Sequence, residues 1–83
     1  MSRDDILRML QQRPFQPFRI RLSDDIVHEI RHPEMVMATP MSLIIGTPTP
    51  NVPFPAVGDY VIVSLLHVVQ LEPLSMPVSP TNN

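Results

Sequence analysis

Hydrophobic and polar residues alternate most regularly in two short runs, residues 18–22 and residues 26–31. Such a two-residue period is typical of strands that have one buried and one exposed face. The runs are separated by Ser23, Asp24 and Asp25, which are residue types that favour a turn. The pattern therefore predicts a β-hairpin whose apolar face the rest of the chain must cover.

Two loop lengths could join these strands, and the facing of the side chains distinguishes between them. A two-residue loop would place Glu29 opposite Ile20, on the apolar face. A three-residue loop pairs Ile20 with His28 instead, and it sets Arg19 across from Glu29 on the exposed face, where the opposite charges attract. We therefore predict the three-residue loop, a type I turn followed by a left-handed residue at Asp25.

The remaining segments predict a short helix before the hairpin and further strands after it. Ser2 can cap a helix over residues 2–12, and Pro14 ends it. Residues 64–67 are too few for an α-helix and predict a single 3₁₀ turn. Further strands are expected over residues 35–38, 42–45, 60–63 and 68–72. This order is typical of a mainly β fold, either a small SH3-like or Sm-like barrel or a strongly bent antiparallel sheet of five to six strands.

Proline spacing divides the chain into one domain, a loop and a tail. We expect a single β-rich domain over residues 1–74 and a disordered tail over residues 75–83. Alternate prolines over residues 47–57 favour an extended loop. A structural linker is the simpler interpretation of this loop, although its Pro-x-x-Pro spacing also fits a recognition strip, with Phe54 as the anchor.

Several separated motifs resemble those of a group of short bacterial proteins. The chain contains the string PFQPFRIRLSDD, then a His-Pro-Glu corner and a later VSLLH segment. The bacterial group has a PFxPFxIxLSDG…HPE…VSLLH pattern in the same order, and the likeness covers roughly residues 14–74. At Asp25 the group tends to have glycine. The resemblance implies a shared fold and no particular activity.

The composition narrows the class of function. The chain of 83 residues has no cysteine, and its net charge of −2 comes from 8 acidic and 6 basic residues, all six of them arginine. This balance disfavours broad binding to a phosphate backbone, which needs a positive field. No apolar run is long enough to span a membrane and the first residues are charged, so we expect neither a membrane span nor a secretory signal, and a cytoplasmic location.

The residue types that carry catalysis or bind metals do not occur in a matching pattern. The three histidines lack metal-site spacing, and no Gly-x-Ser-x-Gly motif surrounds a serine. The paired carboxylates, Asp4-Asp5 and Asp24-Asp25, suit a helix start and a turn. Two glycines cannot form a glycine-rich phosphate loop. We therefore expect a protein that is not an enzyme and that has no metal and no cofactor.

Strands that are apolar on both sides point to association. Residues 61–63 form such a run, and a strand of this kind needs cover on both faces. We predict a structural or protein-interaction module that self-associates as a homo-oligomer, with another protein as a second kind of partner. The alternative is an Sm-like RNA-binding ring, which we favour less because few aromatic residues are present for stacking. The candidate interaction surface consists of Arg19, Arg21, Arg31 and Phe54.

Overall fold

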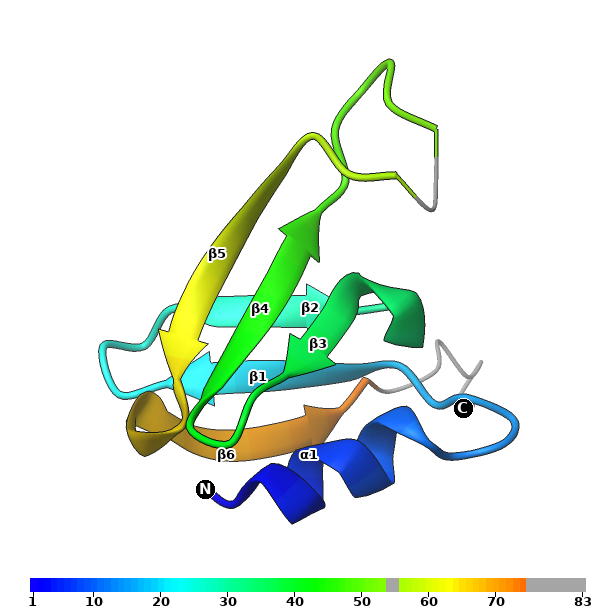
Figure 1. Cartoon of the computed structure of the whole chain (residues 1–83). Helices are drawn as coiled ribbons and strands as arrows, with labels where there is room; N and C mark the ends of the chain where they lie inside the picture. Colours follow the sequence, from blue (N-terminus) through cyan, green and yellow to red (C-terminus); the bar gives the residue numbers. More distant parts are fainter. Residues whose placement is uncertain (54–55, 75–83) are drawn as a thin grey trace, which may run out of the picture.

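The computed structural model describes residues 1–53 and 56–74. In this part of the chain a short helix, α1 (Arg3–Leu10), precedes six strands that form two three-stranded antiparallel sheets (Figure 1). The prediction of a mainly β fold with an N-terminal helix is confirmed. The described strands form neither a closed barrel, the first of the two predicted forms, nor the single bent sheet of the second, because they divide into two sheets.

The first sheet contains the predicted hairpin and has the order β2-β1-β6. Its pairing register is the predicted one, with Ile20 opposite His28 and Arg19 opposite Glu29. β6 pairs with the other side of β1, so the last described strand completes the sheet that the hairpin begins. The strands are β1 (Phe18–Leu22), β2 (Val27–Ile30) and β6 (Val68–Pro73).

The hairpin turn has the geometry that the register requires. The Leu22 amide donates a hydrogen bond to the Ile26 carbonyl at 2.9 Å, which closes the three-residue loop. Asp25 has a φ of 68°, the left-handed conformation. Asp24 Oδ1 accepts a hydrogen bond from the Ile26 amide at 3.1 Å. The predicted turn and the predicted left-handed residue are both confirmed.

The second sheet has the order β3-β4-β5, and two 3₁₀ turns connect it to the first. η1 (Pro33–Met35) leads from β2 into β3, so Met35 belongs to this turn and not to the strand expected from residue 35. η2 (Leu65–His67) leads from β5 into β6, at the position where the sequence predicts a 3₁₀ turn. The strands are β3 (Val36–Ala38), β4 (Ser42–Thr47) and β5 (Asp59–Ser64).

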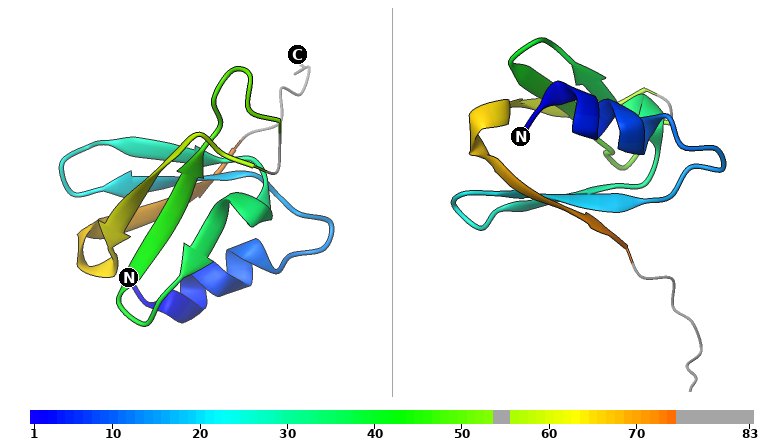
Figure 2. Two further views of the ribbon diagram at one scale, coloured as in Figure 1. Left: turned by 45° about the horizontal axis from the view of Figure 1, so that its top comes forward. Right: turned by 90° about the horizontal axis from the view of Figure 1, so that it is seen from below.

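The core lies between the two sheets and beneath the helix. Seen from below, α1 lies across the opening between the sheets (Figure 2). The Ser2 hydroxyl accepts a hydrogen bond from the Asp5 amide at 3.3 Å and donates one to the Asp5 carboxylate at 2.9 Å, which fixes the start of the helix. Ile6 and Leu10 then join the buried cluster. The fully buried side chains are Ile6, Phe18, Ile20, Ile30 and Leu43.

One residue of the predicted apolar face is not covered. Ile20 is completely buried, whereas the side chain of Ile26 is 51% exposed. Ile26 immediately precedes β2, at the tip of the hairpin, and the core cluster does not include it. Alternation assigned Ile26 to the apolar face that the rest of the chain covers, and the core does not extend to this residue.

Candidate interaction surface

An apolar row crosses the outer face of the second sheet. The strand register places Met37 of β3 opposite Ile44 of β4, and Ile44 opposite Ile62 of β5. Met37 and Ile62 are 63% and 65% exposed, while Val63, the next residue along β5, is buried against the core. Tyr60, two residues before Ile62, extends the row on the same face. We call Met37, Ile44, Tyr60 and Ile62 the outer-sheet patch.

A shallow groove runs through the outer-sheet patch. Its volume is about 440 Å³, and the four patch residues line it together with Glu34, Met35, Gly46 and Val57. Gly46 lies opposite Tyr60, and a Cβ atom at this position would be 2.9 Å from Cγ1 of Val57. Glycine therefore lets the side chain of Val57, from the loop before β5, lie directly over β4. The result is an apolar depression with one carboxylate, that of Glu34, at its margin.

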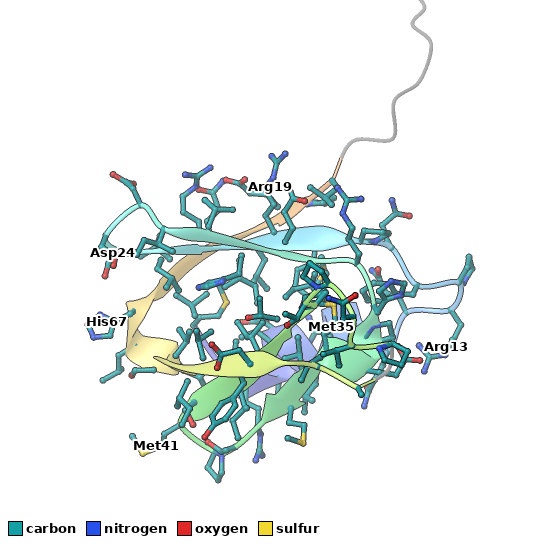
Figure 3. All side chains as sticks on the ribbon, turned by 90° about the horizontal axis from the view of Figure 1, so that it is seen from above. Arg13, Arg19, Asp24, Met35, Met41 and His67 are labelled. Atoms are coloured by element: carbon teal, nitrogen blue, oxygen red, sulfur yellow. The ribbon has the colours of Figure 1, made fainter. Side chains whose placement is uncertain are left out.

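The arginines predicted as an interaction surface lie on the other sheet. Arg19 and Arg21 alternate along β1, and in Figure 3 Arg19 points away from the second sheet. All three arginines lie within ion-pair distance of a carboxylate. Arg19 pairs with Glu29 at 3.6 Å, Arg31 pairs with the same Glu29 at 2.9 Å, and Arg21 pairs with Glu72 at 3.0 Å. Phe54, the fourth predicted residue, lies outside the described residues.

The charges of Arg19, Arg21 and Arg31 pair with carboxylates of the same chain, and the pair of Arg21 and Glu72 shifts the pKa values of both groups. A hydrogen bond from the Arg21 guanidinium holds the pKa of the Glu72 carboxyl below its ordinary value. The same hydrogen bond raises the pKa of Arg21. Because each guanidinium is close to a carboxylate, the exposed face of the first sheet carries interleaved opposite charges and not a positive patch.

A contact between Ser23 and His67 was not anticipated from the sequence. Ser23 Oγ lies 3.3 Å from His67 Nδ1, and the Ser23 amide donates to the His67 carbonyl at 2.8 Å. Both residues border a second hollow of about 290 Å³ between the hairpin tip and β5. Figure 3 shows His67 and Asp24 at the same edge of the molecule.

The polar side chains next to this pair accept hydrogen bonds from backbone amides. Asp24 Oδ1 accepts a hydrogen bond from the Ile26 amide, and Ser64 Oγ accepts one from the Leu66 amide at 3.2 Å. The Ser23–His67 contact therefore joins the hairpin tip to η2 and gives a structural reason for both residues. The sequence pattern could not reveal this contact, because the two residues are 44 positions apart in the chain.

Metal-ligating side chains do not converge in the described part of the chain. Within residues 1–53 and 56–74, no three or more histidine, cysteine, aspartate or glutamate side chains are placed to hold a metal ion. A search of the same residues finds no helix with the length and apolar character needed to cross a membrane.

Comparison with known proteins adds no relative. No family model, no curated protein and no solved structure matches this chain. The resemblance to short bacterial proteins therefore stays a prediction.

Proposed function

We propose that this protein is a non-enzymatic structural or protein-interaction module that self-associates in the cytoplasm. The outer-sheet patch carries the proposal. Antiparallel sheets commonly bury one face and expose a polar one to water, but here three adjacent strands each place an apolar side chain, Met37, Ile44 or Ile62, on the outward face. Contiguous apolar residues on an exposed face mark interaction sites more often than isolated ones do.

The energetics are consistent with association. A domain of this size buries only about 60% of the surface of its unfolded chain, so its own core contributes modest stability. Fully covering an exposed side chain such as Ile62 or Met37 contributes roughly 1.5–3 kcal/mol. Several such side chains together can offset the roughly 4–15 kcal/mol lost in translational and rotational freedom on association.

The order of elements supports a relationship to small SH3-like or Sm-like folds. A helix precedes the strands, a single 3₁₀ turn joins the last two strands, and the last strand pairs with the first. In this protein the two sheets remain separate, so the relationship that we propose is to an opened version of such a fold. Fold alone does not assign a function.

An Sm-like RNA-binding ring is the alternative that this relationship raises. It would depend on Arg19, Arg21 and Arg31, and all three guanidinium groups are already close to Glu29 or Glu72. The net charge of −2 also opposes the binding of a polyanion. The paired charges favour the interaction module over the RNA-binding ring.

Size-exclusion chromatography with light scattering tests the proposal directly. At tens of micromolar protein we expect a mass that is a multiple of the 9.4 kDa chain, falling towards the monomer on dilution. A monomer throughout this range would overturn the proposal.

A further inference from the structure

β5 lies at an edge of the second sheet. The order β3-β4-β5 gives this strand one partner, β4. Figure 1 shows no strand beside β5 on its other side within the described part of the chain. An edge strand presents backbone N–H and C=O groups that another strand can bind.

The hydrogen bonds of the neighbouring turn show which groups of β5 face outward. The Leu65 amide donates to the Met41 carbonyl at 2.9 Å, so Leu65 directs its backbone groups towards the strand that begins next to Met41. Directions alternate along an antiparallel strand, and Val63, Val61 and Asp59 therefore also face β4.

It follows that Tyr60, Ile62 and Ser64 direct their backbone groups to the open edge. The Tyr60 amide is already satisfied, because it donates to Asp59 Oδ1 at 2.7 Å. Within residues 1–53 and 56–74, the carbonyl of Tyr60, both backbone groups of Ile62 and the amide of Ser64 have no hydrogen-bond partner, and the hollow beside the hairpin tip runs along Ile62 and Ser64. Along the strand these groups alternate between acceptor and donor, so the row is complementary to a second copy of itself related by a two-fold axis at Ile62.

The other edge strands carry features that discourage pairing, whereas the one charged residue of β5, Asp59, stands at its first position. β6 contains Glu72 and ends at Pro73, β2 contains Glu29, and β3 has only 3 residues. Charge, proline and short length are the usual means by which proteins protect sheet edges. From Tyr60 to Ser64, β5 has no charged residue and no proline.

We propose that a second copy of this chain pairs with β5 in antiparallel orientation, about a two-fold axis at Ile62. This inference rests on the proposed self-association and specifies its interface. The Ile62 amide donates to the carbonyl of the partner's Ile62 and the reverse, and the Ser64 amide donates to the carbonyl of the partner's Tyr60. The second sheets of the two copies become one continuous sheet.

Side-chain chemistry agrees with this pairing. Ile62 lies beside the partner's Ile62 on the outer face, so each of these two exposed side chains shields one flank of the other. Tyr60 lies beside the partner's Ser64, where its ring can extend over the new strand pair. Asp59 falls beyond the partner's Ser64, away from the partner's Asp59, so like charges do not meet. Because the contact uses the same strand on both copies, it closes at a dimer.

Disulfide formation tests the register. The chain has no cysteine, so Ile62→Cys introduces a single thiol. Directly hydrogen-bonded antiparallel residues have Cα atoms about 5.5 Å apart, within the range that a disulfide spans. Under mild oxidation we expect most of the Ile62→Cys variant to form a covalent dimer. Leu66→Cys, at the 80% exposed residue that follows the strand, is the matched control and should remain monomeric after denaturation.

Amide hydrogen exchange on the unmodified chain gives an independent readout. The amides of Ile62 and Ser64 should exchange at least tenfold more slowly at high protein concentration than at low concentration, while the amide of Leu66, which donates to Ser64 Oγ of its own chain, should not change. A dimer by light scattering that shows neither this protection nor a cross-link in the Ile62→Cys variant would overturn β5 pairing but leave self-association standing. Cross-linking only in the double variant Ile62→Cys/Val69→Cys would also overturn it, because the partner strand would then be β6. A monomer at all concentrations would overturn both proposals.

Discussion

Arg21 on β1 holds Glu72 on β6 through two parallel hydrogen bonds. Nε of the guanidinium donates to Oε2 at 3.0 Å, and Nη2 donates to Oε1 at 3.3 Å. The two residues are 51 positions apart in the chain. Because this planar pairing matches the geometry of both groups, it fixes the last strand against the first.

The pair predicts a specific dependence of stability on pH. The pKa of Glu72 is lower in the folded protein than its unfolded value of about 4.5, so the ionised carboxylate stabilises the fold. This contribution is fully present above the unfolded pKa and is lost as the pH falls through the folded pKa. We expect Glu72→Gln to lower the free energy of unfolding at pH 7 and to have little effect at an acidic pH below the folded pKa of Glu72.

Urea denaturation at the two pH values measures this effect, and a double-mutant cycle is its control. Arg21→Gln should cause a similar loss at pH 7, and the double variant should lose less than the sum of the two single losses. Equal losses at both pH values would show that Glu72 acts through packing and not through charge.

Asp25 is held in the left-handed conformation, which glycine adopts without steric cost. We expect Asp25→Gly to stabilise the protein by about 0.5–1 kcal/mol, which raises the melting temperature by a few degrees for a domain of this size. Asp24→Gly is the matched control and should destabilise, because it removes the carboxylate that accepts the Ile26 amide. A lower melting temperature for Asp25→Gly would contradict the turn geometry.

Ile20 and Ile26 belong to the same predicted apolar face but differ in burial. Ile20→Ala should cost roughly 2–5 kcal/mol, because it leaves a cavity in the core. Ile26→Ala should change the free energy of unfolding by less than about 0.5 kcal/mol, since the side chain already contacts water. Chemical denaturation of both variants distinguishes the two sites, and similar costs would show that the core reaches the hairpin tip.

Ile62→Lys should separate self-association from folding. A lysine at the edge of β5 puts a strongly hydrated charge where a second copy would pack, and we expect light scattering to report a monomer. The free energy of unfolding of that monomer should fall by no more than about 0.5 kcal/mol, because Ile62 is exposed in the isolated chain. Val69→Lys, at another exposed position on β6, should keep the assembly of the unmodified protein.

The paired arginines predict that single-stranded RNA does not bind. Fluorescence anisotropy with a labelled oligouridine at low ionic strength should show no change up to tens of micromolar protein. Binding that weakens with salt and is lost in Arg19→Gln/Arg31→Gln would support the RNA-binding ring instead.

The sequence by itself determined the local features of this fold. Alternation over residues 18–31 predicts the hairpin, and the need to keep Glu29 off the apolar face selects its register and the left-handed turn at Asp25. Residues 64–67 predict the 3₁₀ turn before the last strand. These features follow from short-range patterns, because side-chain facing and turn chemistry depend on neighbours in the chain.

Only the tertiary structure decided which apolar faces are covered. It leaves Ile26 and Ile62 exposed, separates the strands into two sheets, and brings Arg21 to Glu72 and Ser23 to His67. The periodicity of hydrophobic residues indicates that one face of a strand is apolar. Which side chains pack on that face depends on segments that are distant in the sequence. The same limit explains why the sequence indicated a double-sided apolar strand at residues 61–63, while the open edge of β5 became visible only once its position in the sheet was known.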